Sequence, residues 1–340
     1  MILVLNCGSQ SIKWKIFSAK GGSASGGDLK LVNQGKRDVF VAEEFENILT
    51  DELGKITEEI TLVGHRVVHG GGIFTKPLEI TPENLAELEK INHLAPLHNP
   101  YNLLGIKISQ KVFAQIPQIA VFDTEFFANL PEKAYTYALP ENIAKEFGFR
   151  RFGFHGISHE FIAKKIKAKK IITVHLGGGS SICAIKNGKV IDTSMGFTPM
   201  EGLVMMTRSG NIDAGIVLEL VKEFGIEGAD KILNKNSGIK GMCGQGDMLK
   251  VLEKIKQGDA ATKLAFDVFV YSVQKYIGGY FAILGGCDVL VFTGSIGAGN
   301  PKTRNAICKG LDILTKTKVL AIETDEELAI ARRLTSYTFK

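Results

Sequence analysis

Two arginines beside glycine are the residues of this chain best suited to hold an oxyanion. Arg66 lies within GHRVVHGGG at 64–72, and Arg208 lies within TRSG at 207–210. Arginine presents a planar fork of donors that matches a carboxylate or a phosphate with two parallel hydrogen bonds. A surface ion pair is the alternative for either one, since the chain has 41 basic residues.

Polar turns, three of them containing glycine, follow four predicted strands. They are NCGS at 6–9, DT at 123–124, HLGGGSS at 175–181 and TGSIGAGN at 293–300. Glycine lets the backbone approach a ligand closely, and successive N–H groups in such turns bind anions. Three glycine-rich turns suggest a polyphosphate ligand, although a plain hairpin explains any single one. The chain has no P-loop, no GxGxxG after a strand and no HRD kinase signature.

Two histidine pairs have a spacing that could suit zinc on a helix. They are His65 with His69 and His155 with His159. Neither pair has the HExxH general base, and the neighbouring glycines argue against long helices there. We therefore expect at least one of these histidines to donate a hydrogen bond to developing negative charge instead of binding a metal.

The composition is that of a folded protein of about two domains. The 340 residues include 38 glycines, where an average composition would give about 24. The net charge of +5 is a small difference between 41 basic and 36 acidic residues, so we expect a small anionic ligand and no nucleic acid. The lysine-rich run at 164–170 is interpreted as the solvated end of a helix that begins near Ser158.

The cysteines and apolar segments indicate the compartment. The five cysteines form no CxxC pair, which fits a reducing cytoplasm. The N-terminus has no basic region before its apolar run, so we expect no signal peptide. Glycines and Asp288 interrupt the most apolar late segment, 281–298, so we expect no membrane span.

The N-terminal hairpin pattern is repeated half a chain later. Residues 1–5 and 12–17 are predicted to form two strands around a tight turn, and 171–174 and 182–185 repeat the pattern with one residue of slack. The Asn187-Gly188 pair then predicts a hairpin turn to a third strand at 190–191. This indicates a duplicated α/β domain, with ligands at the carboxyl ends of the strands.

Further elements alternate between strand and helix. Residues 119–122 and 288–292 are predicted buried strands, and 261–278 is a helix with apolar residues at helical spacing. The last helix is predicted to begin at Thr324, with a capping box formed by Thr324 and Glu327. The fold class is therefore α/β.

Taken together, these segments resemble the acetate kinase family along nearly the whole chain. The motifs that carry the resemblance are LNCGSQS at 5–11 with Lys13, GHRVVHGG at 64–71, APLHNP at 95–100, FDT at 122–124, RRFGFHG at 150–156 with Ser158 and His159, HLG at 175–177, DTSMGFTPMEG at 192–202, TRSG at 207–210, FTG at 292–294 and TDEE at 324–327. The resemblance implies two ribonuclease H-like domains of the actin-like ATPase type, 1–127 with 327–340 and 128–326, and an active-site cleft between them.

The resemblance also implies a reaction and its catalytic residues. The enzyme would transfer the γ-phosphoryl group of ATP reversibly to acetate, giving acetyl phosphate and ADP, with Mg²⁺ or Mn²⁺. Arg66 and Arg208 would hold the carboxylate and the transferring phosphoryl group, and His155 would add a hydrogen bond. Asp123 would organise arginine or metal, because a carboxylate needs no deprotonation at pH 7.

Ligand contacts are carried over in the same way. Asn6 and Glu326 would position the metal, although a first-turn acid is also favoured by the helix dipole alone. The pocket for the methyl group would be lined by Val68, Leu97, Phe154 and Pro199, for each of which core packing is the alternative. The nucleotide would meet His175, Leu176, Gly177, Gly178, Gly179, Asp247, Gly294, Ser295, Ile296, Gly297, Ala298 and Gly299.

The sequence departs from the family on the nucleotide side. The family's GGIGEN loop is GSIGAGN at 294–300, and its D-x-R is Asp247-Met248-Leu249. The chain is also shorter than usual members. A propionate or butyrate kinase and a non-catalytic, ATP-dependent switch of the actin or Hsp70 type are the alternatives. Related enzymes are dimers, so we expect a homodimer.

Overall fold

The computed structural model describes residues 1–8, 11–19 and 29–337, and the chain divides into two compact units. The first unit comprises Met1–Ala128, His155–Phe161 and Asp325–Lys340, and the second comprises Asn129–Phe154 and Ile162–Thr324. Residues 155–161 thus group with the first unit, whereas the expected division by resemblance assigned them to the second domain. Ser9 of the predicted turn lies outside the described residues.

The first unit is built on a six-stranded sheet with the order β3-β2-β1-β4-β6-β5. Its strands are β1 (Ile2–Gly8), β2 (Ser11–Ala19), β3 (Leu29–Asp38), β4 (Leu62–Val67), β5 (Leu78–Glu79) and β6 (Gln118–Phe122). Its helices are η2 (Ala42–Glu44), α1 (Phe45–Gly54), α2 (Pro82–Lys90), η3 (Asn92–Leu94), α3 (Asn99–Val112), η4 (Glu125–Phe127), the start of α6 (Gly156–Lys165) and α13 (Glu326–Thr335).

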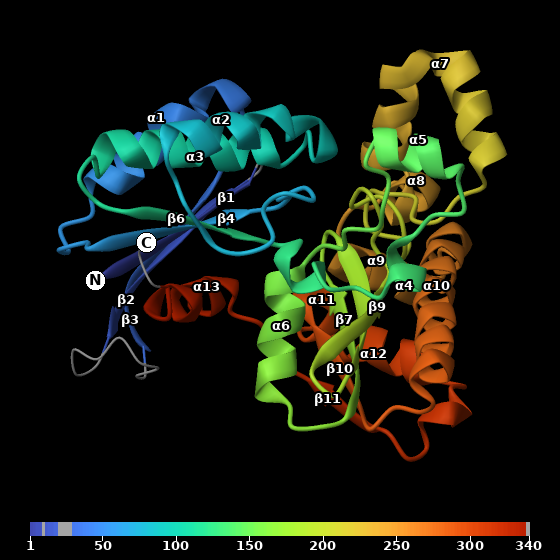
Figure 1. The fold of residues 1–340 in the computed structure, drawn as a ribbon. Helices are drawn as coiled ribbons and strands as arrows, with labels where there is room; N and C mark the ends of the chain where they lie inside the picture. The colour runs from blue at the N-terminus through green and yellow to red at the C-terminus, as the bar shows by residue number, and fades with distance from the viewer. Residues whose placement is uncertain (9–10, 20–28, 338–340) are drawn as a thin grey trace. The chain divides into compact units, whose positions relative to one another are not determined.

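Both faces of β1 are buried, which explains why this strand is apolar at every position from Ile2 to Leu5. Successive side chains of a strand point to opposite faces. Leu3 and Leu5 pack with α1 and α3, whereas Ile2 and Val4 pack with α13. Helices α1, α2 and α3 accordingly cover one face, and α13 lies against the other (Figure 1).

The second unit is built on a five-stranded sheet with the order β11-β10-β7-β8-β9. Its strands are β7 (Lys170–Leu176), β8 (Ser180–Lys186), β9 (Lys189–Thr193), β10 (Val289–Thr293) and β11 (Lys318–Ala321). Its helices are α4 (Glu132–Tyr135), α5 (Glu141–Glu146), α7 (Ala214–Lys235), α8 (Gly238–Cys243), α9 (Met248–Lys256), α10 (Ala260–Leu284), α11 (Gly294–Gly297), α12 (Pro301–Cys308) and η5 (Asp312–Leu314).

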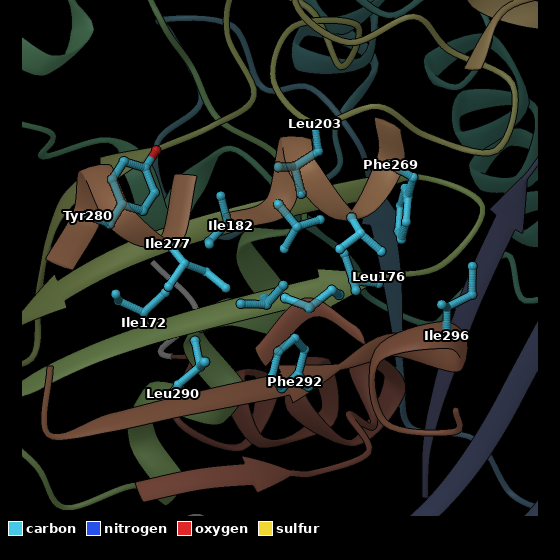
Figure 2. Packing of buried hydrophobic residues seen from close by; sticks show 14 of the residues in the cluster. Ile172, Leu176, Ile182, Leu203, Phe269, Ile277, Tyr280, Leu290, Phe292 and Ile296 are labelled. Atoms are coloured by element: carbon cyan, nitrogen blue, oxygen red, sulfur yellow. The ribbon is translucent and has the colours of Figure 1, made fainter. Parts of the chain in front are cut away.

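The apolar face of α10 packs against the second sheet and forms the main core of this unit. Phe269 and Ile277 of the helix belong to one buried cluster with Ile172 of β7 and Phe292 of β10 (Figure 2). The predicted helix at 261–278 is therefore confirmed, and it continues to Leu284.

The two sheets confirm the predicted duplication. In the first, β1 pairs antiparallel with β2 and parallel with β4. In the second, β7 pairs antiparallel with β8 and parallel with β10. The paired residues Gly8 and Ser11 close the first hairpin, and Leu176 and Ser180 close the second, which is one residue longer. Asn187 and Gly188 have φ values of 51° and 76°, as a primed hairpin turn requires.

Two predicted helix starts are wrong by two residues each. The last helix, α13, begins at Glu326, and its N-cap is Asp325, whose side chain accepts a hydrogen bond from Leu328 N at 2.9 Å. Aspartate caps helices at least as well as threonine, so the box predicted from Thr324 does not form. Helix α6 begins at Gly156 rather than Ser158.

The lysine run is also only partly a helix end. Lys164 and Lys165 are exposed in the last turn of α6, whereas Lys170 belongs to β7. Among the described residues, no helix has the length and apolar character needed to cross a membrane.

Candidate active site

Arg66 and Asp123 form a buried ion pair at the carboxyl ends of two neighbouring strands of the first unit. Arg66 is near the end of β4, and Asp123 directly follows β6, which pairs parallel with β4. Arg66 Nη2 lies 2.7 Å from Asp123 Oδ2, and Arg66 Nε donates to the same oxygen at 3.2 Å. The backbone N–H of Asp123 donates to Val67 O at 3.0 Å, which fixes the carboxylate beside the guanidinium. This two-pronged contact sets the orientation of Arg66.

Glu326 and Asn6 approach the same guanidinium from two other elements. Arg66 Nη1 lies 3.0 Å from Glu326 Oε2 and 3.4 Å from Asn6 Oδ1. Asn6 Nδ2 donates in turn to Glu327 Oε1 at 3.1 Å. The structure therefore brings four predicted site residues together within the first unit, from β1, β4, β6 and α13.

Burial and the neighbouring charges shift the pKa values of this cluster in opposite directions. Burial raises the pKa of Asp123 to about 6, because the contacts with Arg66 offset only part of the lost hydration and Glu326 adds a second negative charge. Burial also acts to lower the pKa of Arg66, but Asp123 and Glu326 outweigh it and raise that pKa above its ordinary value. Arg66 thus stays cationic beside two acids.

The segment that carries His155 is attached to the same strand end. Gly156 N donates to Asp123 O at 3.0 Å, and a Cβ at Gly156 would lie 2.1 Å from that oxygen. Only glycine permits this approach, and it places the backbone of His155 next to the Asp123 turn. His155 itself has a φ of 57°, an uncommon conformation for a residue with a side chain.

The histidine pairs do not lie on the single long helix that their spacing could suggest. His65 lies in strand β4 rather than a helix, and its Nε2 is 2.7 Å from Gln118 Oε1. His159 is fully buried with its ring against Phe127. Within the described residues, no three His, Cys, Asp or Glu side chains are grouped to hold a metal.

Two buried asparagines of α3 hold the segment that carries Val68. Asn102 Oδ1 accepts from Val68 N at 2.9 Å, and its Nδ2 donates to Cys7 O at 2.6 Å. Asn99 Oδ1 accepts from His69 N at 3.0 Å. Val68 is buried, and Leu97 is half-buried two residues before α3 begins. The α3 amides therefore link the two expected pocket segments of this unit.

In the second unit, Arg208 and Pro199 are in contact. Arg208 Nη1 donates to Pro199 O at 3.3 Å, and burial lowers the pKa of Arg208 from its ordinary value. Phe154 is fully buried, and Pro199 is half-buried. These three residues are the expected arginine and pocket residues of the second unit.

The two glycine turns of the second unit lie side by side, since β7 and β10 pair in parallel up to His175 and Thr293. Gly177 N donates to Gly179 O at 3.0 Å, which folds the first turn tightly. Gly294 has a φ of 77°, and a Cβ there would lie 2.5 Å from Leu176 O. The backbone of 294–297 forms the short helix α11, which packs against the end of β7.

Asp247 has a capping role in the structure. It is exposed at the N-cap of α9, where its Oδ1 accepts from Leu249 N at 2.8 Å and from Lys250 N at 3.1 Å.

Arg304 is a residue that the sequence analysis missed near the second turn. Its Nη1 donates to Gly297 O at 2.9 Å and to Ala298 O at 2.6 Å.

Other missed residues support the first cluster. Lys15 Nζ lies 2.8 Å from Asp325 Oδ1 and 3.4 Å from Glu327 Oε2, so it holds the start of α13. Asn102 and Lys15 carry no local signal of a site. Asn99, in contrast, lies in the motif APLHNP at 95–100, which was noted without a role for the asparagine.

A duplicated sheet of this order, with its polar residues at the carboxyl ends of parallel strands, places the chain among two-domain α/β proteins of the actin-like ATPase fold. The sequence profile of the acetokinase family matches residues 23–337, and the chain belongs to that family of phosphotransferases.

Individual relatives agree with this assignment. The chain is 40% identical to the acetate kinase of Bacteroides fragilis, over 97% of each chain. The crystal structure of Porphyromonas gingivalis acetate kinase has 37% identity and a TM-score of 0.83, with 97% of each chain covered. A propionate kinase from Francisella tularensis has 34% identity and a TM-score of 0.85, with 98% of each chain covered. The alignment with the Bacteroides enzyme runs over 387 positions, so that relative has segments that this 340-residue chain lacks.

Proposed function

We propose that this chain transfers the γ-phosphoryl group of ATP reversibly to a carboxylate oxygen of acetate, giving acetyl phosphate and ADP. The bond from the γ-phosphorus to the bridging oxygen of ADP breaks, and a bond from that phosphorus to the acetate oxygen forms. The observation that carries the proposal is the partly buried Arg66 near the end of β4, held between Asp123, which follows β6, and Glu326, which begins α13. Membership of the acetokinase family supports the choice of acceptor.

Arg66 and Arg208 would provide the positive charge that the reaction needs. In a loose transition state, charge spreads over the equatorial oxygens of the phosphoryl group, and fixed donors stabilise it without reorganisation. Arg66 is suited to this role because two acids fix its orientation. Arg208 is suited because its guanidinium places a positive charge in a largely buried environment, where Nη1 donates to Pro199 O.

Asp123 would orient Arg66 rather than remove a proton. Its carboxylate contacts Nε and Nη2 of the guanidinium, and acetate is already ionised at pH 7. His155 would add a hydrogen bond to the phosphoryl oxygens. The contact of Gly156 N with Asp123 O supports this role, because it attaches the His155 backbone to the same turn.

The residues expected to position Mg²⁺ fit a hard cation. Asn6 Oδ1 and Glu326 Oε2 are oxygen donors that face one nitrogen of Arg66. Magnesium typically takes one or two protein oxygens and completes its shell with water and phosphate, and Mn²⁺ accepts the same donors. When bound, the ion would neutralise phosphate charge; Glu326 and Asn6 would hold it.

The nucleotide phosphates would meet the turn from His175 to Gly179, and the adenosine side would lie over 294–299. The tight backbone of these glycines supports both assignments. Asp247 would contact the ribose through the part of its carboxylate that its two capping hydrogen bonds do not use. We propose ATP as the phosphoryl donor.

The family resemblance would assign contacts with the methyl group of the acid to Val68 and Leu97 of the first unit and to Phe154 and Pro199 of the second. One methylene in a hydrophobic pocket is worth about 1–3 kcal/mol, so propionate should be a poorer substrate. The likeness to a propionate kinase at 34% identity makes propionate the second candidate acceptor. Relative kcat/KM values for acetate, propionate and butyrate distinguish these activities.

We also propose a cytoplasmic homodimer. Helix α7 has large apolar side chains that are exposed in the single chain: Ile216, Leu218, Phe224 and Ile226. Such a concentration of exposed apolar residues is typical of a protein interface. Sedimentation of the purified chain tests this, and a monomer at micromolar concentration contradicts it.

A hydroxylamine trap tests the proposed reaction. Wild-type protein is incubated with ATP, Mg²⁺, acetate and hydroxylamine, and the hydroxamate formed from the acyl phosphate is measured by its iron complex. We expect hydroxamate that depends on both ATP and acid. ADP release without hydroxamate, with acetate or propionate, would overturn the proposal.

A further inference from the structure

The loop at 194–202, which carries Pro199, is anchored at both ends. At its start, Ser194 N donates to Ile182 O at 2.9 Å, and Ser194 Oγ accepts from Ile182 N at 3.0 Å. At its end, Gly202 and Asn211 exchange two hydrogen bonds of 2.9 Å. The ends are therefore fixed, and the path of the loop between them depends on its internal contacts.

Two side chains hold the middle of the loop: Tyr137 and Glu201. The hydroxyl of Tyr137 donates to Glu201 Oε2 and accepts from Phe197 N at 2.8 Å. The other carboxylate oxygen of Glu201 is paired with Arg151, whose Nη1 also donates to Ser194 O at 3.1 Å. The Tyr137 hydroxyl thus connects two points of the loop, one on each side of Pro199.

Gly196 shows how closely these groups pack. A Cβ at this position would lie 1.7 Å from Glu201 Oε2 and 2.2 Å from the Tyr137 hydroxyl. Gly196 O also accepts from Phe152 N at 3.0 Å and from Gly153 N at 3.3 Å. The loop is thereby attached to the segment that ends in Phe154, the other expected pocket residue of this unit.

The hydroxyl of Tyr137 stays protonated and can therefore donate a hydrogen bond. Burial and the adjacent Glu201 carboxylate raise the pKa of Tyr137 well above its ordinary value, so the hydroxyl keeps its proton throughout the working pH range. A pocket wall discriminates between acids of different length only if it does not move away from the longer one. Such rigidity needs contacts behind the wall, and this cluster provides them.

We propose that Tyr137 and Glu201 are positioning residues that set the acid-length specificity of this enzyme, by holding Pro199 and Phe154 in place from behind. This inference rests on the proposed function. It adds two residues that are not among the expected contacts of the acid or the nucleotide. Their removal should widen the range of acids accepted more than it lowers turnover of the smallest one.

The test compares Tyr137→Phe with Tyr135→Phe. The first removes the hydroxyl that links Glu201 and Phe197 and keeps the ring. The matched control removes a hydroxyl from a ring of α4 that lies 4.0 Å beneath the Arg150 guanidinium. For each protein, kcat and KM are measured with acetate, propionate and butyrate at saturating ATP, and KM for ATP is measured separately.

In Tyr137→Phe we expect the acetate-to-propionate ratio of kcat/KM to fall roughly 5-fold, as the loss of one hydrogen bond allows. KM for the acid should change, and KM for ATP should not. Glu201→Gln should shift the ratio in the same direction, because it weakens the pair with Arg151. In Tyr135→Phe the ratio should stay at the wild-type value.

A purely structural role gives a different result. Partial unfolding lowers kcat for every acid by the same factor and leaves the ratio unchanged, so an unchanged ratio in both Tyr137→Phe and Glu201→Gln overturns the inference while the proposed function stands. Failure of the wild-type protein to form any acyl phosphate overturns the proposed function and the inference with it.

Discussion

Arg66 Nη2 lies 2.7 Å from Asp123 Oδ2, although 57 residues separate the two in the sequence. Asp123 is 1% exposed and Arg66 is 17% exposed, so the pair is largely removed from water. The parallel pairing of β4 with β6 brings them together, because both side chains lie at the carboxyl end of the sheet. This pair fixes the guanidinium on which the proposed catalytic mechanism depends.

Arg66→Lys tests whether the fork of donors matters beyond its charge. Lysine keeps a positive charge near Asp123 and Glu326 but cannot make the two-pronged contact, so a substrate oxyanion would lose its fixed partner. We expect kcat for acyl phosphate formation to fall by about 10²-fold or more, the typical cost of losing one oxyanion donor. Steady-state kinetics with acetate measure it. Turnover near the wild-type value would remove Arg66 from the mechanism.

The raised pKa of Asp123 predicts that the pH–activity profile has an acidic limb. A pKa of about 6 means that the carboxylate becomes protonated as the pH falls through 6, which weakens its hold on Arg66. We therefore expect kcat to fall between pH 6.5 and 5.5 in the wild type. Asp123→Asn should have low activity with no such limb. A limb that persists in Asp123→Asn would assign it to another group.

The lowered pKa of His65 predicts that the folded protein loses stability at acidic pH. Burial lowers the pKa of His65 to about 4, although the contact with Gln118 acts in the opposite direction. Between pH 6.5 and 4 the unfolded chain binds the proton and the folded one does not, so this contribution to stability is present above pH 6.5 and is lost as the pH falls.

The expected loss at pH 5 is about 2 kcal/mol of unfolding free energy. Urea unfolding followed by the fluorescence of Trp14, the single tryptophan and a residue of the first unit, measures it. His65→Gln should reduce the difference between pH 7 and pH 5, and His93→Gln, at an exposed position, should not. An equal difference in all three proteins would contradict the assignment to His65.

Asn102→Ala should destabilise the first unit and disturb the site. The substitution leaves Val68 N and Cys7 O without their buried partner, at a cost of about 1–3 kcal/mol. The same Trp14 unfolding measurement detects it, with the exposed Asn47→Ala of α1 as the control. If both variants unfold at the wild-type urea midpoint, the Asn102 bridge contributes no stability.

The features that could be predicted from the sequence are those with a local pattern. The repeated hairpin was visible because apolar runs and glycine turns recur half a chain apart, and both sheets confirm it. Arg66 is predicted because it stands beside the glycines of GHRVVHGGG, and Asp123 because it directly follows a predicted strand. In the structure both lie at the ends of strands. Parallel neighbours in such a sheet bring these ends together.

The contacts that the sequence does not predict join residues that are far apart in the chain and of common polar types. Lys15 with Asp325, and Tyr137 with Glu201, are pairs of common polar residues that only the folded chain brings together. The start of α13 was missed for a local reason, because Thr324 and Asp325 are both good capping residues and the sequence does not choose between them.

Phosphorus NMR of the wild-type protein with ATP, Mg²⁺ and acetate tests the central claim most directly, since it identifies the product. We expect signals of acetyl phosphate and ADP to appear as the γ-phosphate signal decreases toward equilibrium, and Arg66→Lys to slow their appearance by about 10²-fold or more. Conversion of ATP to ADP and inorganic phosphate alone, at a rate that acetate does not change, would contradict the claim.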